Sequence, residues 1–470
     1  MLRCNQFLLI LLFPVFSFAQ HYVPDSTVLT ADNFIAIVKK FHPVIKQADI
    51  NIEKATAAIV IARGDFDPSL YLNSQQKTFD GKNYYQYINP ELKIPTWYGI
   101  EVKAGVENNN GQYLNPEVSA GKTSYLGISV PLAKNLVMDK RRAVLQQSKL
   151  FKLQSESERQ NTINDILNEA YGSYWNWVKE YQLYKIITDA VTVNEKRFQL
   201  VKIGFRQGDR PAIDTIEALA QLQQFQFLQS EYLVKFKNAG VELSAFLWLQ
   251  NNTYYQLDDN IVPDKKWEVQ NRNIILPGML DDLLYTARQT HPKLKMYTYK
   301  LQSLEVERKL KFQSLLPAVN LQANLLNKGY NVLKNADAAF YENNNKFGVN
   351  ISLPLRLSEG RGAYRIARLK ITETNYALSL QQQEIENKIR YYYNELAALQ
   401  KQIDIYEQAY NNYQILFRGE DTRFSAGEST LFLLNNRENK VLEALQKLTE
   451  LKAKFYKTQI AVQWAAGKLL

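Results

Sequence analysis

The sequence predicts a mixed α+β membrane protein in which a β-barrel continues into a long antiparallel α-helical coiled coil. Three observations lead to this fold class. An ordered set of sequence landmarks occurs twice, runs of about ten residues alternate between apolar and polar side chains, and two segments of more than sixty residues contain no proline. The chain should therefore consist of two internal repeats, each with strands and one very long helix.

The N-terminus has the features of a secretory signal peptide over residues 1–19. Arg3 supplies a positive charge, an apolar run extends from Phe7 to Phe18, and Ser17-Phe18-Ala19 is a small-x-small cleavage site. A membrane anchor is the alternative, but it would need a run of ~20 apolar residues. The only cysteine, Cys4, would be removed with the signal. No disulfide, thiolate metal site or lipid anchor is therefore expected.

The mature chain offers no apolar run of 18 residues. If it crosses a membrane, we expect a β-barrel, because only helices and closed barrels satisfy the backbone in lipid. The formal net charge is +10, but the basic residues are spread along the chain and mixed with acids. This pattern favours a solvated, helix-rich surface and not a nucleic-acid site.

Four landmarks occur in the same order in both halves of the chain. They are a His-Pro step, a proline that opens a strand-like run, an Ile-Ser-x-Pro-Leu strand end and a turn with glycine. They lie at His42-Pro43 and His291-Pro292, at Pro68 and Pro317, at Ile128–Leu132 and Ile351–Leu355, and at Phe205–Gly208 and Phe424–Gly427. One such pair arises easily by chance, whereas an ordered set of four indicates duplication.

The landmarks divide the chain into two repeats joined by a linker at 251–277. The first repeat, 20–250, has predicted strands within about 69–132, a long helix over about 136–205 and a return helix over about 211–250. The second, 278–470, has predicted strands within about 317–355, a long helix over about 361–424 and a return helix over about 428–467.

The number of strands is left open between four and six. The first half offers up to four and the second offers two: about 69–78, 84–93, 98–107 and 123–132, then about 317–325 and 346–355. The extra pair could be an extracellular hairpin or an enlargement of the barrel. Alternation places one face in an apolar medium and the other in water, which fits a half-buried soluble sheet as well as a transmembrane barrel. An interfacial aromatic girdle is expected from Tyr84, Tyr85, Tyr87, Trp97 and Tyr98.

The long helices carry heptad seams. In the second, apolar residues follow one another in steps of four and three from Ile385 to Phe417, which indicates coiled-coil packing. Each helix would be ~100 Å long at ~1.5 Å per residue. The helices after Pro43 and Pro211, placed end to end, nearly match one long helix, and so do those after Pro292 and Gly427. A soluble coiled coil is the alternative explanation of the seams alone.

This ordered pattern resembles the outer membrane efflux protein family, the TolC-like outer membrane factors, from about Leu29 to Leu469. The resemblance implies a homotrimer in the outer membrane of a Gram-negative bacterium, with its helical part in the periplasm. It also implies a periplasmic adaptor (membrane fusion) protein and an inner-membrane pump as partners. The chain would be a passive conduit that exports small molecules such as drugs, toxic compounds or metal ions. A TolC-like channel for type I protein secretion and a soluble periplasmic coiled-coil scaffold stay open as alternatives.

The turns between the long and return helices are expected to form the periplasmic mouth. The site residues are Phe205, Gly208, Arg210, Asp214, Glu217, Arg423, Phe424 and Gly427. Tips of the family carry an acid six positions after the glycine and, in one repeat, another nine after it. Here these positions hold Asp214 and Glu217 in the first repeat but Leu433 and Asn436 in the second, which departs from TolC.

The two acids allow a functional and an ordinary explanation. A carboxylate ring from Asp214 and Glu217 would favour cations, and Arg210 or Arg423 could pair with Asp214 as a latch. Alternatively, they are solvated charges at a helix start, where the helix dipole favours acids.

No catalytic residue, metal site or cofactor is predicted. Of the three histidines, His42 and His291 lie in the His-Pro steps, and Gly360-Arg361-Gly362 lacks the spacing of a phosphate loop. No nucleophile elbow is present either. The sequence therefore indicates a protein that is not an enzyme.

Overall fold

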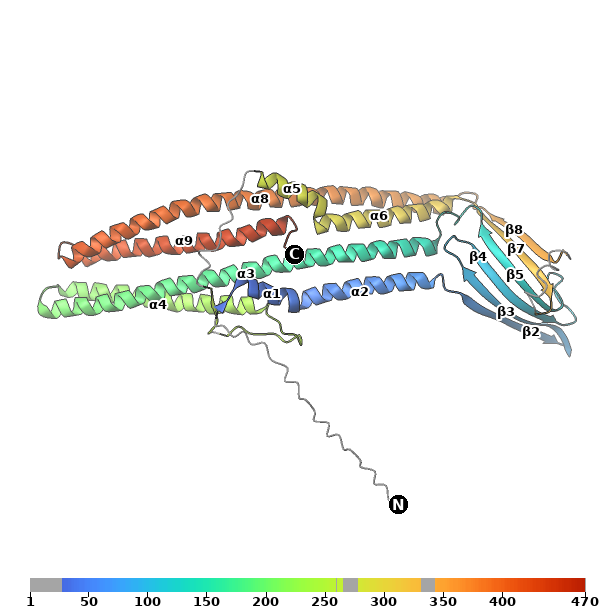
Figure 1. The fold of residues 1–470 in the computed structure, drawn as a ribbon, viewed down its shortest axis with the longest axis horizontal. Helices are drawn as coiled ribbons and strands as arrows, with labels where there is room; N and C mark the ends of the chain where they lie inside the picture. The colour runs from blue at the N-terminus through green and yellow to red at the C-terminus, as the bar shows by residue number, and fades with distance from the viewer. Residues whose placement is uncertain (1–27, 259, 265–277, 331–342, 470) are drawn as a thin grey trace, which may run out of the picture.

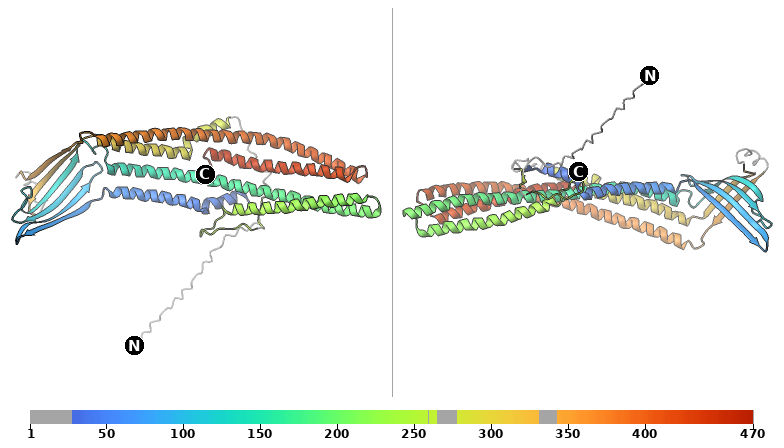
Figure 2. Two further views of the ribbon diagram at one scale, coloured as in Figure 1. Left: turned by 180° about the vertical axis from the view of Figure 1, so that it is seen from behind. Right: turned by 90° about the horizontal axis from the view of Figure 1, so that it is seen from below.

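The computed structural model describes residues 28–258, 260–264, 278–330 and 343–469, and the predicted signal peptide lies outside them. The helices run side by side along the long axis of the molecule, and one β-sheet lies at one end (Figure 1). Views from behind and from below show the same arrangement (Figure 2). Among the described residues, no helix is both long and apolar enough to cross a bilayer.

The same order of elements occurs twice: two short helices, strands, a 68-residue helix and a return helix. The first set is α1 (Ala31–Phe41), α2 (Pro43–Gly64), β2 (Ser69–Phe79), β3 (Lys82–Pro95), β4 (Glu101–Asn110), β5 (Gly121–Pro131), α3 (Lys140–Gln207) and α4 (Ala212–Ser244). The second is α5 (Met279–Thr290), α6 (Pro292–Phe312), η2 (Gln313–Leu315), β7 (Ala318–Lys328), β8 (Asn345–Ser352), α8 (Ser358–Ser425) and α9 (Leu431–Ala465). Two short strands, β1 (Val28–Leu29) and β6 (Val262–Pro263), pair in parallel outside the main sheet.

The two longest helices, α3 and α8, have 68 residues each, so each is ~100 Å long. Asp139 caps the start of α3, because its carboxylate accepts a hydrogen bond from the Arg142 amide at 2.8 Å. Neither helix contains proline, and the buried residues of α8 include Ile385, Ile389 and Leu396 from the predicted seam.

The return helix α4 ends earlier than the sequence suggested, at Ser244 instead of about residue 250. The Ser244 hydroxyl donates to the Gly240 carbonyl at 2.7 Å and accepts from the Leu257 amide at 2.9 Å. This side chain therefore holds the reversed chain against the helix end. The helix periodicity continues to Leu247, which is also buried, so periodicity alone predicts a longer helix.

Each His-Pro step is a helix start in which the histidine caps the following helix. His42 Nδ1 accepts from the Val44 amide at 3.3 Å, and His291 Nδ1 accepts from the Lys293 amide at 3.1 Å. Proline takes the first helical position, where no amide hydrogen is needed. His291 is 5% exposed, and this burial lowers its pKa to about 4.

Acid should therefore destabilise the fold through His291. Its pKa is about 4 when folded and ~6.5 when unfolded, so the unfolded chain binds the proton more tightly. The stabilisation is complete above pH ~6.5 and is lost as the pH falls toward 4, by up to ~1.4 kcal/mol per pH unit. Unfolding midpoints at fixed protein concentration should show this slope between pH 7.5 and 5. His291→Asn keeps a capping oxygen and should flatten it, and an unchanged slope would refute the assignment.

The sheet has six strands in the order β2-β3-β4-β5-β7-β8, and every neighbouring pair is antiparallel. The hairpin of β2 and β3 pairs over nearly its whole length and continues the sheet beyond β4. Of the two arrangements that the sequence allowed, the extra pair therefore enlarges the sheet. The two edge strands of the single chain are β2 and β8.

The largest hydrophobic core lies near the middle of the molecule's length and not under the sheet. It joins α1, α2, α3, α4, α5, α6, α8 and α9, and its largest fully buried side chains include Tyr174 and Trp177. The Tyr174 hydroxyl donates to the Leu29 carbonyl at 3.0 Å, which attaches β1 to the long helix. On the other repeat, Arg288 of α5 donates to both carboxylate oxygens of Glu386 at 2.7 and 2.9 Å.

Candidate functional site: the sheet faces and the helix tips

One face of the six-stranded sheet is apolar and exposed. The register places apolar side chains in a row across five strands: Leu70, Leu92, Ala104, Leu126 and Leu325. A second row continues through Ile94, Val102, Ile128, Ala323 and Phe347. The exposed fractions are 76% for Leu70, 45% for Ile128 and 66% for Phe347. A contiguous apolar surface of this extent marks a membrane or protein contact.

The opposite face of the same strands is polar and charged. Glu101 pairs with Lys93 at 2.9 Å and with Arg141 at 3.1 Å. On β7 the residues of this face include Gln322 and Asn324, which oppose Ser129 and Gly127 of β5. The predicted alternation therefore holds across the sheet: the paired strands place their apolar side chains on one face and their polar side chains on the other. Only the polar face is suited to contact with water.

The aromatic residues that the sequence suggested for a girdle lie at both ends of the sheet. Tyr84, Tyr85 and Tyr87 belong to the first half of β3, which begins far from the helices. Trp97 and Tyr98 lie in the turn from β3 to β4, and the Trp97 ring stacks at 4.2 Å on Phe66, just beyond α2. Trp97 is 54% and Tyr98 79% exposed.

The two helix turns have the same backbone geometry. Gly208 and Gly427 have φ of 86° and 79°, values at which a side chain would be strained. At the first turn the amides of Gly208 and Asp209 donate to the carbonyls of Phe205 and Gly204 at 3.1 and 2.9 Å. At the second, Gly427 and Glu428 donate to Phe424 and Arg423 at 3.1 and 2.8 Å. Both are Schellman ends of a long helix.

The two turns contact each other through Arg210. Its guanidinium lies 4.0 Å from the centre of the Phe424 ring, and its Nη2 donates to the Phe424 carbonyl at 3.2 Å. Next to this contact, Val201 of α3 and Ala218 of α4 pack with Leu431 and Leu434 of α9. Phe205 is 44% exposed.

The two acids of the first tip have different surroundings. Asp214 Oδ2 is 3.8 Å from Arg210 Nη1, within the same turn. The sequence offered Arg210 and Arg423 as possible partners of Asp214. Arg210 is the one that lies beside it, whereas Arg423 is exposed. Glu217 Oε1 accepts from Asn435 Nδ2 of α9 at 3.2 Å. Asp214 is therefore part of the tip itself, while Glu217 takes part in the contact between the helix pairs.

A buried ion pair near the tips was not found by sequence reasoning. Arg197 of α3 donates to both carboxylate oxygens of Glu438 of α9, with Nη2 3.2 Å from Oε1. Asn194 Nδ2 donates to Glu438 Oε2 at 3.2 Å, and Arg197 Nη1 donates to Asn194 Oδ1 at 3.1 Å. Asn194 interrupts the apolar seam of α3, and a polar residue in a seam is the signal that could have indicated this network.

Comparison with known proteins agrees with this geometry. Residues 283–468 match the model of the family described as outer membrane efflux protein. No curated protein sequence matches the chain. Among solved structures, the Campylobacter jejuni CmeC outer membrane channel is similar with a TM-score of 0.61 and 15% identity, covering 93% of this chain and 85% of that one.

Two further outer membrane proteins are similar over the same extent. For the Vibrio cholerae outer membrane protein VceC the TM-score is 0.62, with 15% identity over 93% of this chain and 96% of that one. For the open state of the Neisseria gonorrhoeae MtrE outer membrane channel it is 0.64, with 13% identity over 93% and 89%. The predicted resemblance is confirmed. The family match covers residues 283–468, in the second half of the chain. The similarity of fold extends over nearly the whole chain.

Proposed function

We propose that this chain is the outer-membrane channel of a tripartite efflux system, a passive conduit that exports small molecules. The observation that carries this proposal is the sheet with one exposed apolar face and one polar face, joined in one chain to helices of 68 residues. The strands have 8 to 14 residues, compared with ~9–11 for a tilted transmembrane strand. Lipid on one face and water on the other explain this arrangement.

The edges of the sheet favour closure between copies. The first edge strand, β2, leads away from α2, and the last, β8, leads back toward α8. A β2 edge can thus pair antiparallel with the β8 edge of another copy, which removes unpaired backbone groups from lipid. In the trimer implied by the resemblance, three six-stranded sheets would give eighteen strands. Barrels of ~16–18 strands leave an aqueous channel.

The helices would continue this channel as a periplasmic tunnel. Their tips would meet a periplasmic adaptor and an inner-membrane pump, and the pump would supply the energy. The likeness of the fold to outer membrane channels over 93% of the chain supports this arrangement.

Membrane retention and conductance together test the proposal. The full chain should stay in the membrane pellet after carbonate extraction and should form ion-conducting channels in planar bilayers. A soluble periplasmic scaffold would be released by carbonate, and a retained protein without conductance would contradict the conduit.

Closure between copies can be tested at the sheet edge. A photo-crosslinking amino acid at Asn73, on the edge strand β2, should join the strand to residues 345–352 of another copy and yield species of up to three chains. The same amino acid at Ser129, on the central strand β5, should give crosslinks within one chain. Only intramolecular products from Asn73 would exclude this closure.

We further propose that Asp214 and Glu217 set the ion preference of the periplasmic mouth. Three copies would bring six carboxylates, a ring that favours cations. Asp214→Asn with Glu217→Gln should lower the cation preference measured from reversal potentials in a salt gradient. Asp189→Asn with Glu195→Gln changes the same charge at exposed positions of α3 and serves as the control. An unchanged reversal potential in the tip variant would contradict the role.

A further inference from the structure

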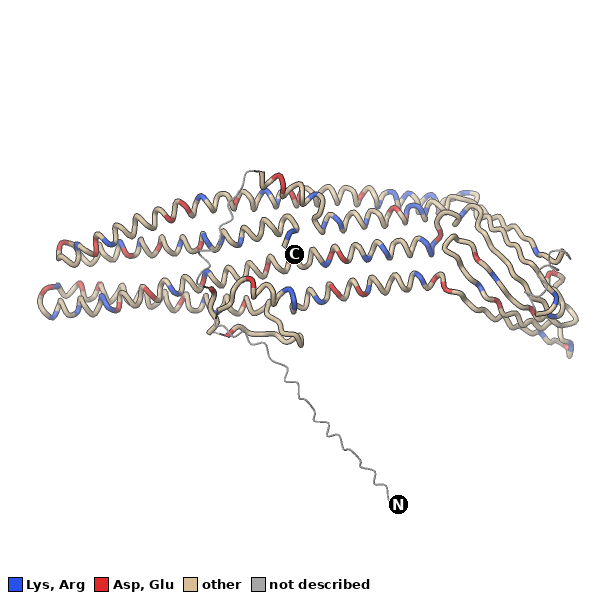
Figure 3. Tube along the Cα trace, viewed as in Figure 1, with Lys and Arg blue, Asp and Glu red and all other residues tan. Residues whose placement is uncertain are grey.

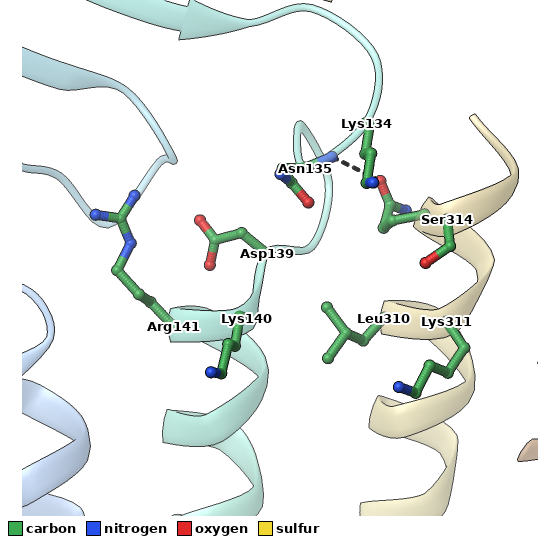
Figure 4. Close-up of a pocket in the computed structure, with 9 residues that line it drawn as sticks. Lys134, Asn135, Asp139, Lys140, Arg141, Leu310, Lys311 and Ser314 are labelled. Carbon is green, nitrogen blue, oxygen red and sulfur yellow. Dashed lines mark hydrogen bonds between the residues drawn. The ribbon is translucent and has the colours of Figure 1, made fainter. Parts of the chain in front are cut away.

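A cavity of about 340 Å³ lies where the sheet meets the helices. It is bounded by the segment between β5 and α3 and by the end of α6 (Figure 4). Its lining residues are Lys134, Asn135, Asp139, Lys140, Arg141, Leu310, Lys311, Gln313 and Ser314. The buried Gln313 accepts from the Asn135 amide at 3.2 Å, which fixes one wall against the other. The volume is in the range of small-ligand sites, ~300–1,000 Å³.

The lining carries positive charge that no acidic residue in the described part of the chain balances. The Asp139 carboxylate already interacts with Arg142. Its Oδ1 accepts from the Arg142 amide at 2.8 Å, and its Oδ2 lies 3.3 Å from Arg142 Nε. Arg141 turns toward Glu101, at 3.1 Å. Lys134, Lys140 and Lys311 remain, and none of these three makes an ion pair with any residue in the described ranges. Figure 3 shows basic residues gathered at this end of α3, α6 and α8.

The register places Lys134 on the apolar side of the sheet. The β5–β7 ladder extends past the strands, because the amides of Leu132 and Lys134 donate to the carbonyls of Val319 and Pro317 at 2.7 and 3.0 Å. Lys134 therefore follows Val130 and Leu132 on the face whose rows are apolar. Leu136 and Val137, just beyond it, are 44% and 73% exposed. The cavity thus adjoins the helix-side border of the apolar face.

We propose that this cavity binds the phosphate of an anionic glycerophospholipid from the helix-side leaflet of the membrane. The inference rests on the proposed function, because a sheet that spans the membrane places its helix-side border at the depth of the lipid phosphates. Lysines near a membrane surface attract anionic lipids. Hydrogen bonds from lysine to a charged phosphate are also stronger than hydrogen bonds between neutral groups. The acyl chains would lie along Leu132, Leu136 and Val137.

Native mass spectrometry of the full chain in detergent, titrated with phosphatidylglycerol or phosphatidylcholine, tests the proposal. Each lysine near the surface contributes roughly fivefold in affinity. The triple variant Lys134→Gln, Lys140→Gln, Lys311→Gln should therefore bind phosphatidylglycerol on the order of a hundredfold more weakly if the three contributions add. The control variant Lys185→Gln, Lys196→Gln, Lys401→Gln removes the same charge at exposed positions away from the cavity and should bind as the unchanged protein does.

Several outcomes would overturn the lipid site. These are equal binding by the triple and control variants, equal binding of phosphatidylcholine and phosphatidylglycerol, or displacement of the lipid by soluble glycerol phosphate at matched concentration. Membrane retention and conductance of the same preparations separate this failure from failure of the proposed function. A channel that conducts but binds no phosphatidylglycerol refutes only the site, whereas a chain released by carbonate refutes both.

Discussion

Arginine in place of Leu126 should prevent the sheet from inserting into the outer membrane. Leu126 lies in the middle of the apolar row, between Ala104 and Leu325, and is 44% exposed. Arginine on the lipid side of a barrel costs ~2–4 kcal/mol near the bilayer midplane. In a closed assembly every copy would carry this cost. We expect most of the variant to be missing from carbonate-resistant membranes and to lack a heat-modifiable folded band on gels.

The matched control for this substitution is Ser129→Arg. Ser129 lies on the same strand but on the polar face, directly opposite Glu101 of β4, so the new guanidinium would meet a carboxylate and water. This variant should insert normally. Equal insertion by both variants would show that the apolar face does not contact lipid, and the channel proposal would lose its main support.

Truncation of Glu438 to alanine should loosen the contact between the two helix pairs near their tips. The side chains of Arg197 and Glu438 are only 11% and 8% exposed, so the truncation leaves a buried guanidinium without its counterion. Loss of one partner of a buried pair costs ~3–5 kcal/mol. The unfolding midpoint should fall, and amide exchange in the first turns of α9 should become faster.

An apolar replacement of both partners distinguishes the cost of an orphaned charge from a need for the pair itself. Arg197→Met with Glu438→Leu removes the charge together with its partner, and such exchanges are often neutral or stabilising. We expect this double variant to unfold near the midpoint of the unchanged protein. If it is as unstable as Glu438→Ala alone, the pair contributes through specific geometry, and the explanation by an unpaired charge is wrong.

The sequence predicted the long helices well because their signals are local. Absence of proline and a repeated seam specify a helix wherever it lies, and α3 and α8 are found at Lys140–Gln207 and Ser358–Ser425. The end of α4 was misplaced because Ser244 ends the helix through a contact with Leu257, thirteen residues later. Local periodicity carries no information about such a contact.

Contacts between repeats could not be predicted for a similar reason. The seams show that helices pack, but they do not say which helix packs against which. Arg197 and Glu438, which are 241 residues apart, therefore remained unpaired in the sequence-based interpretation. The number of strands in the sheet was undecided because alternation identifies a strand but not its neighbours. The pairing of β3 with β4 shows that the β2–β3 hairpin belongs to the same sheet.

The central core has a mechanical consequence. Each long helix passes through it, while the shorter helices beside that helix end near it (Figure 1). Trp177 lies about 45 Å from the end of α3 at Gln207, at ~1.5 Å per residue. We therefore expect a small change in the packing of this core to be amplified at the helix tips, because a rotation of about 3° there would move the end of α3, ~45 Å away, by ~2 Å.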